Sequence, residues 1–466
     1  MHLVSCIMNQ FLFIMHHASC IVNHASSVNT MVAKIKDQKK TETGALRYLG
    51  ERINEANTLA IDRILSVEPV FIDVDTALNV IPGMTPDTIL HAGPPIEWER
   101  MCDPMKRAVR GALVFEGLAE NDEAAIQLLK RKKVKLSPNH HHDAAGAMTG
   151  IISPSMPVIV TKDSTFGKTV FSTFNEGAGK VLWFGSFEKE TLDRLKWIRD
   201  IFGPVMKKVI KKAQGIPIWS ILAQGIQMGD ECHNRHAASS NLFLKRILEP
   251  LVSIDLSKRV LLQVYKFIAG NSHFFLNMTM AACKLTMDAA RNIRESTVVT
   301  AISRNGTDFG IRISGLGNEW FTAPAPYLKD ALYNPGYDFN DGAPDIGDSS
   351  IIETMGLGGF AIAAAPAMAS FAGGGFQESI RITKEMGRIT LVKNQKFGIP
   401  VLDFEGTPTG IDLRKVVEIG ISPSINSAVV HKSSGAGQIG AGIVKAPYEC
   451  FSKALKAFGR KYKLAA

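Results

Sequence analysis

Hydrophobic and polar positions follow two different periods along this chain, which predicts both strands and helices. Short apolar runs at 70–74, 158–161 and 170–174 are typical of buried strands. Over Leu244–Leu251 the apolar residues recur instead at helical spacing and form one stripe. Strand-like and helix-like segments alternate through the N-terminal part, so we expect an α/β architecture there.

Changes in this pattern and in composition divide the chain into regions. Residues 31–135 and 136–231 are predicted as two α/β domains, 232–297 as a small helical domain, and 298–466 as a glycine-rich α+β domain. The expected fold class is therefore α/β (α+β) and multi-domain, with mixed sheets, flanking helices and a mid-chain helical domain. A chain of 466 residues is long enough for this division.

Residues 1–30 form an atypical N-terminal extension that is apolar and rich in histidine. Its apolar run Phe11–Met15 is too short to span a membrane, and no basic residues precede it as they do in a secretory signal. The glycine- and alanine-rich stretch Met355–Ala372 contains Pro366, so we predict a buried helix or turn rather than a membrane span. We expect a cytoplasmic protein with no membrane contact.

Composition and charge then exclude several classes of protein. A chain that is 45% hydrophobic and 21% charged is typical of a globular protein rather than a disordered one. The net charge of +9 suits an anionic partner, but the basic residues form no stripe with interleaved aromatics, so no nucleic acid is expected. The six cysteines contain no CxxC pair, which argues against a zinc ribbon or a disulfide framework.

The first candidate for chemistry is the cluster Asn139–Asp143, which holds three consecutive histidines. Histidine can act as acid, base, oxyanion donor or metal ligand near neutral pH. In an extended segment, His140 and His142 would point to one side and His141 to the other, and Asp143 could orient an imidazole. The residues alone leave three alternatives open: a hydrogen-bonded loop, a metal site, and a site for an anion or acyl group.

The second candidate is Gly229–Arg235, which contains an acid pair, a thiol, a histidine, an amide and a guanidinium. Such groups are costly to bury unless they satisfy one another or a ligand. A helical run follows, so main-chain N–H groups can face an anion there. Adjacent Cys232 and His233 side chains diverge, which argues against a nucleophilic pair between them.

Two further segments have groups that suit anions. The turn Arg304–Asp308 and nearby Arg312 supply guanidiniums, which bind carboxylate or phosphate with paired hydrogen bonds, although a plain surface hairpin is the alternative. The loop Gly435–Gly442 contains Gly-x-Gly-x-x-Gly, a weak signal without a strand before it and a helix after it. A nucleotide-linked ligase therefore remains a minor alternative.

Together these segments resemble the YlbE/AllG family. The motifs that carry the resemblance occur in order between about Ile53 and Lys456, and they are His91–Ile96, Ser137–Ala144, Gly229–Arg235, Gly270–Asn277, Arg304–Gly310 and Gly437–Gly442. One departure is Asn139, where a cysteine is expected in related proteins. A nucleophilic thiol at that position therefore cannot be essential here.

The resemblance implies a subunit of an oxamate carbamoyltransferase-like complex in purine and allantoin catabolism. Such a complex transfers a carbamoyl group between oxalurate and phosphate, with oxamate and carbamoyl phosphate as products. The implied partners are FdrA-like and AllH-like companion subunits, the small anions oxalurate, oxamate and phosphate, and further copies of the chain. No cofactor and no metal is expected, and the implied fold is multi-domain α/β with a small helical insert.

Carbamoyl transfer passes through a tetrahedral intermediate whose oxyanion needs preorganised donors, and this sets the predicted roles. The predicted catalytic residues are His140, His142, Asp143, Asp230, Glu231 and His233. The predicted substrate- and anion-binding residues are His91, Asn234, Arg235, Asn271, His273, Arg304, Asn305, Arg312, Gly437, Gln438 and Gly440. The alternatives are a non-catalytic ligand-binding or scaffold subunit of an acyl-CoA synthetase-like complex, and a metal-dependent hydrolase or lyase.

Overall fold

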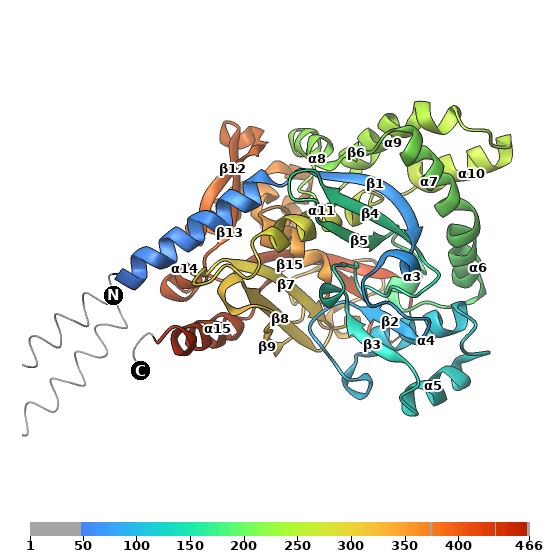
Figure 1. The fold of residues 1–466 in the computed structure, drawn as a ribbon, viewed down its shortest axis with the longest axis horizontal. Coiled ribbons are helices and arrows are strands. Elements are labelled where there is room, and N and C mark those ends of the chain that lie inside the picture. The colour runs from blue at the N-terminus through green and yellow to red at the C-terminus, as the bar shows by residue number, and fades with distance from the viewer. Residues whose placement is uncertain (1–47, 373–374, 434, 464–466) are drawn as a thin grey trace, which may run out of the picture.

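The structure is a computed structural model that describes residues 48–372, 375–433 and 435–463 (Figure 1). The predicted extension 1–30 lies outside the described residues. A helix over 48–66 opens the described chain, and strands and helices alternate after it. The predicted α/β (α+β) class with mixed sheets is confirmed.

An antiparallel sheet of order β5-β4-β1-β6 forms the upper centre of the molecule (Figure 1). Its strands are β1 (Pro69–Thr76), β4 (Pro157–Asp163), β5 (Thr169–Thr173) and β6 (Ile216–Pro217). Helices α7 (Gly203–Lys212) and α11 (Leu276–Ala289) pack against these strands. Because helices cover the sheet, the strands read as continuous apolar runs, as predicted.

A parallel pair of strands positions the first motifs. It consists of β2 (Thr88–His91) and β3 (Lys135–Pro138), joined through α4 (Asp103–Phe115) and α5 (Asp122–Lys130). Asn121 caps the N-terminus of α5, because its side chain accepts from the backbone N–H of Ala124 at 3.0 Å. Since both strands run the same way, the motifs that follow them meet at one edge.

The middle of the chain is helical, as predicted. The helices of this region are α6 (Lys189–Trp197), a π-helical turn Ile198–Phe202, α7 (Gly203–Lys212), α8 (Ile218–Gln227), α9 (Ala237–Val252), α10 (Lys258–Ala269) and α11 (Leu276–Ala289). The short helix α3 (Ala77–Val80) lies earlier in the chain, directly after β1. Helices α9 and α10 lie at the upper right edge of Figure 1. In contrast, α11 is buried along almost its whole length between the first sheet and the C-terminal part.

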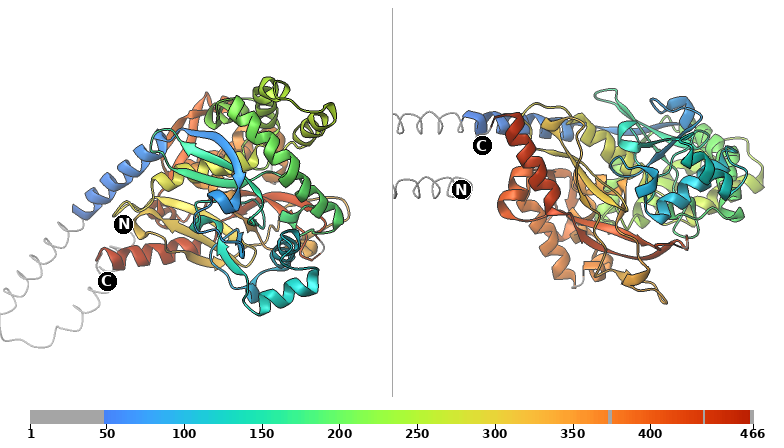
Figure 2. Two further views of the ribbon diagram at one scale, coloured as in Figure 1. Left: turned by 45° about the vertical axis from the view of Figure 1, so that its right-hand side comes forward. Right: turned by 90° about the horizontal axis from the view of Figure 1, so that it is seen from below.

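The C-terminal part holds the remaining sheets, seen from below in Figure 2. Its strands are β7 (Val299–Asn305), β8 (Asp308–Ile313), β9 (Phe321–Pro324), β10 (Leu332–Tyr333), β11 (Ile346–Gly347), β12 (Thr390–Ile399), β13 (Glu405–Ile411), β14 (Ser424–Val430) and β15 (Gln438–Lys445). Its helices are α12 (Ile351–Met355), α13 (Phe376–Arg388), α14 (Leu413–Ile419) and α15 (Tyr448–Lys461). The C-terminal helix, α15, docks on β8 and β9.

The glycine-rich stretch after α12 is built of short 3₁₀ turns rather than one long helix. Among the described residues, no helix is both long enough and apolar enough to span a membrane. The main hydrophobic core runs through both halves, because residues as far apart as Ile61 and Val430 belong to one cluster. The predicted domain boundaries remain a prediction.

Candidate functional site

The buried carboxylate of Asp348 joins the first motifs to the C-terminal part. Its Oδ1 accepts the backbone N–H of Gly93 at 2.9 Å and the hydroxyl of Ser303. Its Oδ2 accepts the side-chain amide of Asn139 at 2.8 Å and the N–H of Gly146 at 3.0 Å. Burial raises the pKa of Asp348, and these hydrogen bonds oppose the rise. Asp348 is therefore a structural centre that sequence reasoning missed.

His91 and Asn305, two predicted anion ligands, take part in the same junction. The Asn305 side chain donates to the carbonyl of Pro94 at 3.0 Å. Gly93 has a φ of +90°, and a Cβ on it would stand 2.5 Å from the Cβ of Asn305, so only glycine fits this approach. The buried ring of His91 bonds to the carbonyl of Ala92 at 2.8 Å, and burial lowers the pKa of His91 to about 4.

Arg304 is fully buried, and its guanidinium is already paired within the chain. It donates to both carboxylate oxygens of Asp345, at 2.8 and 2.9 Å. It also donates to the carbonyl of Gly347 at 2.7 Å and to the Ser427 hydroxyl at 3.0 Å. The surface-hairpin alternative is wrong, because β7 and β8 form the hairpin but Arg304 and Asn305 lie in the core. An anion would have to displace Asp345 to reach this guanidinium.

The histidine cluster is not extended. Residues Asn139–His141 form a 3₁₀ turn, so the expected alternation of the side chains is wrong. His142 is held at both ring nitrogens, which lie 2.6 Å from the carbonyl oxygen of Pro82 and 2.8 Å from Ser137 Oγ. Asp143 faces Arg291 at 3.7 Å.

His140 and His141 both contact Trp320. Buried His140 packs edge-on to the indole and has Nε2 3.6 Å from Asp348. Exposed His141 accepts from the indole N–H at 3.1 Å. Burial lowers the pKa of both imidazoles, that of His141 to about 4. Both histidines are therefore neutral near pH 7.

The acid pair of the second cluster fixes its loop. Asp230 accepts from the N–H groups of Ala238 and Ser239, at 3.1 and 2.7 Å, and from the Ser239 hydroxyl at 2.8 Å. Glu231 accepts from the three successive N–H groups of residues 233–235. Burial raises the pKa of Glu231 to about 7, against the effect of nearby His233.

Cys232 and Arg235 complete this loop. Cys232 is buried and adopts a φ of +68°, which is unusual for a non-glycine residue and marks a constrained backbone. Burial raises the pKa of its thiol, so a thiolate nucleophile is disfavoured. Arg235 donates through Nε to the carbonyl of Gly229 at 2.9 Å.

His233 is oriented by a carboxylate that sequence reasoning missed. Its Nδ1 lies 2.7 and 2.9 Å from the two oxygens of Glu353, which is fully buried in α12. Glu353 also accepts the N–H groups of Gly359 and Asn426, at 3.0 and 3.1 Å, so its position is fixed. In the described part of the chain, Nε2 of His233 has no hydrogen-bond partner. An imidazole held at Nδ1 and open at Nε2 suits a general base.

A pocket of about 40 Å³ beside His233, here called the His233 pocket, unites several predicted motifs. Its polar lining consists of Asn175, His233, Asn234, His273, Ser349 and Gln438, and its apolar lining includes Met148, Trp183 and Leu276. His273 donates from Nε2 to the carbonyl of Asn234 at 2.7 Å. Asn271 does not line the pocket but donates to Asn175, which does, at 2.8 Å.

Among the pocket residues, Asn175, Trp183 and Ser349 were not predicted. They come from separate segments, and no spacing in the sequence connects them. Met148, with a φ of +52°, is a further constrained non-glycine residue at the pocket. That conformation is visible only in the fold.

The glycine loop reaches the pocket through Gln438 alone. Gly437 has a φ of +100°, and a Cβ on it would meet the carbonyl oxygen of Gly179 at 2.6 Å. Gly440 lies inside β15, which pairs with β14 and β10. The loop joins two antiparallel strands, so the strand-to-helix context of a nucleotide-binding motif is absent here.

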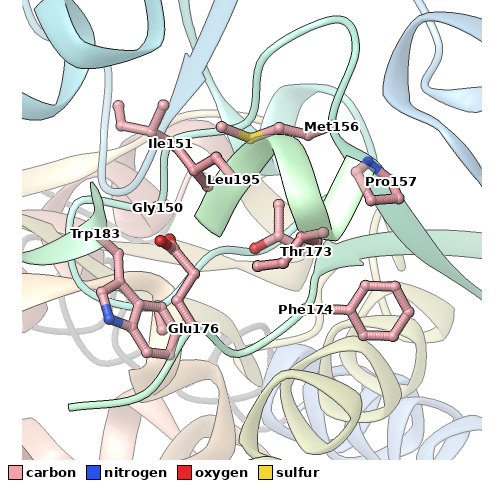
Figure 3. A pocket seen from close by; sticks show the side chains of 11 residues that line it. Gly150, Ile151, Met156, Pro157, Thr173, Phe174, Glu176, Trp183 and Leu195 are labelled. Atoms are coloured by element: carbon pink, nitrogen blue, oxygen red, sulfur yellow. The ribbon is translucent and has the colours of Figure 1, made fainter. Parts of the chain in front are cut away.

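A second pocket lies across Trp183 and Ala147, which line both cavities. Figure 3 shows the Glu176 carboxylate pointing between Trp183, Ile151 and Thr173. The carboxylate accepts the N–H of Leu182 at 3.2 Å, and burial raises the pKa of Glu176 to about 7. Across the described ranges, no group of three or more His, Cys, Asp or Glu side chains is arranged to hold a metal ion.

Comparison with known proteins gives consistent matches over most of the chain. A sequence model of the family "Oxamate carbamoyltransferase subunit AllG" matches residues 134–349. The subunit AllG of Escherichia coli (strain K12) is 42% identical over 408 residues, which are 87% of this chain and 97% of AllG. The E. coli protein YahG, described as uncharacterized, is 44% identical over 414 residues, 89% of this chain and 88% of YahG.

One solved structure has the same fold. It is a conserved protein of unknown function from Enterococcus faecalis V583, 45% identical, with a TM-score of 0.86. The match covers 88% of this chain and 98% of that chain.

Proposed function

Because the chain belongs to the AllG family, we propose that it acts as the AllG-like subunit of an oxamate carbamoyltransferase, with carbamoyl transfer at the His233 pocket. The observation that carries this proposal is the Glu353–His233 pair, which leaves an unbonded Nε2 on a pocket shared by several predicted motifs. Asn234, His273 and Gln438 of the predicted site line the same pocket.

In the proposed reaction, a phosphate oxygen attacks the carbamoyl carbon of oxalurate and forms a C–O bond. The C–N bond to the oxamate nitrogen then breaks, and carbamoyl phosphate and oxamate leave. His233 takes the proton of the phosphate hydroxyl through Nε2 and returns it to the departing nitrogen. Glu353 stabilises the imidazolium between these two steps.

The polar groups around the pocket are suited to the charge that develops. The Asn234 amide and the Ser349 hydroxyl can donate to the tetrahedral oxyanion. Asn175 and Asn271 are bonded to each other, so their orientation is set before substrate arrives. No cofactor is needed for this group transfer.

The small volume of the pocket indicates that the site is incomplete in the isolated chain. A volume of about 40 Å³ holds a few waters, whereas substrate pockets usually measure roughly 300–1,000 Å³. Gly177 and the exposed Ala178 border the pocket, and they are the part best placed to move. We therefore expect full activity only with FdrA-like and AllH-like companion subunits.

The test is reconstitution with those companions, measuring carbamoyl phosphate formed from oxalurate and phosphate. Replacing His233 by Gln should lower kcat by a factor of roughly 10²–10⁴, the usual contribution of a general base. His142→Gln is the matched control, because both nitrogens of that ring are bonded within the chain, and it should keep most of the activity. Full activity of the His233→Gln complex would contradict the proposal.

A second candidate function is a non-catalytic ligand-binding subunit. The one observation that favours it is the small volume of the His233 pocket. In that case His233→Gln would weaken binding of oxalurate or oxamate to the isolated chain. The reconstituted complex would then show a raised KM and an unchanged kcat.

A further inference from the structure

Away from the His233 pocket, basic side chains gather in the core around the end of α11. This buried cation cluster consists of Lys284, Arg291 and Arg312, with His140 beside them. Lys284 and Arg312 are almost fully buried, and the Arg291 side chain is only 16% exposed. Charges in such positions are costly unless opposite charges compensate them.

The chain itself compensates this charge only in part. Asp288 bonds to Lys284 and lies 3.5 Å from Arg291, and Asp143 lies 3.7 Å from Arg291. Lys168 adds a further cation 3.8 Å from Asp288. Within the described residues, no carboxylate lies within 4 Å of Arg312. The two aspartates thus face four cations.

Arg291 and Arg312 share one neutral acceptor. Both guanidiniums donate through Nη2 to the amide oxygen of Asn318, at 2.6 Å from Arg291. Arg312 also stacks on the ring of Trp320, with 5.4 Å between the guanidinium carbon and the ring centroid. An anionic oxygen would stabilise the two cations more strongly than this uncharged amide oxygen does.

Several polar groups in the cluster have no hydrogen-bond partner. The Nε groups of Arg291 and Arg312 and both ring nitrogens of His140 are buried without a hydrogen bond. Buried polar groups are almost always satisfied in folded proteins. Burial and the neighbouring Arg291 lower the pKa of Arg312 to about 10, and burial lowers that of Lys284 to about 8, as expected where like charges are crowded.

Among the residues of the cluster, Arg291 reaches a groove that is open to solvent. A groove runs past the end of α11 and the turn between β4 and β5, and its lining includes Arg63, Lys168, Asp288, Arg291 and Asn292. Arg291 therefore reaches both the groove and the buried donors. The Asp163 carboxylate in the same groove is occupied by the backbone N–H groups of residues 68, 165 and 166.

We propose that the buried cation cluster is a binding site for a small oxyanion, a phosphate or carboxylate group that enters by this groove and is held by Arg291 and Arg312. Its charge offsets the excess of cations, and its oxygens accept from the unpartnered Nε groups. The site is distinct from the His233 pocket, and the inference does not depend on carbamoyl transfer.

The test uses the full chain in chloride buffer at constant ionic strength. Inorganic phosphate, sulfate and acetate are titrated separately by calorimetry, with thermal melting as a second readout. We expect saturable binding of at least one of them and a matching rise in Tm. Phosphate and sulfate without acetate would identify a tetrahedral oxyanion, and acetate a carboxylate. No binding beyond the chloride control for any of the three would overturn the proposal.

Variants then locate the bound anion. Arg291→Gln and Arg312→Gln should each weaken the affinity by about tenfold or more, the effect of losing a charge-assisted hydrogen bond. Arg294→Gln is the matched control, because that side chain is 79% exposed, and it should keep the wild-type affinity. His233→Gln should also keep it, which separates this site from the proposed transferase pocket.

Undiminished anion binding in both Arg291→Gln and Arg312→Gln would place the anion elsewhere and overturn the proposal. If Arg312→Gln does not fold, Arg291→Gln and the wild-type titration still decide the question. Removing an uncompensated buried charge should leave Arg312→Gln at least as stable as the wild type in buffer without oxyanions. A purely structural arginine would instead show a large loss of Tm there.

Discussion

Among single side chains, His142 and His233 show how one residue type serves two purposes. Both ring nitrogens of His142 are bonded to its own chain, so the ring ties a loop together. His233 is bonded at one nitrogen only, and the other faces a pocket. The difference lies in neighbours distant in sequence, since Glu353 is 120 residues away from His233. The chemistry of each imidazole is therefore set by the fold.

Glu353→Gln tests the positioning of His233. An amide keeps the shape and can still accept from Nδ1, but it does not stabilise the imidazolium, so kcat of the reconstituted complex should fall by roughly 10–100-fold with KM little changed. Glu378→Gln, on the exposed face of α13, is the control and should leave kcat unchanged. Equal kcat for Glu353→Gln and wild type would rule out this role.

Glu176 should make stability depend on pH. Its pKa is about 7 in the folded chain, because burial disfavours the carboxylate, and 4.5 is the ordinary value of the unfolded state. The folded state therefore binds more protons between these values, and the stabilisation present below pH 4.5 is lost as pH rises through 7. The total is on the order of 3 kcal/mol.

Urea unfolding at pH 5 and pH 8 measures this effect. Glu176→Gln cannot ionise, so its stability should fall less than that of the wild type between the two values. The same pH dependence in both proteins would show that Glu176 is not the group responsible.

At the level of elements, the sequence predicted strands and helices well and the site only in part. The runs at β4 and β5 and the stripe of α9 depend on local periodicity, which the chain displays directly. Local patterns also marked His233, Asn234, His273 and Gln438. They could not show which polar groups were already satisfied, as Arg304 is by Asp345, because such pairing depends on tertiary contacts.

Asp230 shows how a polar residue can stabilise the start of a helix. It follows α8 and closes the first turn of α9 by accepting two backbone N–H groups and a hydroxyl. The high density of polar residues predicted a catalytic role for Asp230. In the structure its carboxylate caps the first turn of α9. Its neighbour Glu231 shapes the following turn in the same way.

Asp230→Ala should lower the free energy of unfolding by about 2–3 kcal/mol, because it leaves three buried donors unsatisfied. Ser257→Ala is the comparison, since Ser257 caps α10 at an exposed position by accepting from Val260, and it should cost about 1 kcal/mol. Chemical denaturation measures both. A smaller effect for Asp230→Ala than for Ser257→Ala would contradict the capping role.

For the whole molecule, Asp348 connects parts of the chain that the sequence divides into separate domains. Its partners Gly93, Asn139 and Gly146 precede it by 255, 209 and 202 residues. Helix α11 is buried between the same two halves. We therefore expect one cooperative unfolding transition for the described chain rather than one for each predicted domain.

Differential scanning calorimetry of wild type and Asp348→Ala checks this expectation. The substitution leaves four donors without an acceptor, so the single transition should move as a whole, with a loss of at least about 3 kcal/mol. Asp62→Ala, on the exposed face of the helix 48–66, should leave it in place. Two transitions, only one of which moves, would instead support independent domains.

The long spans closed by Asp348 also bear on how the protein is made. At about 5–20 residues per second, the ribosome adds Asp348 roughly 13–50 s after Gly93. During that interval the nascent chain lacks the acceptor for the N–H groups of Gly93 and Gly146, so the β2–β3 edge cannot close. Folding of the N-terminal half is then completed only after Asp348 has been added, and a chain terminated before Asp348 is a natural substrate for chaperones.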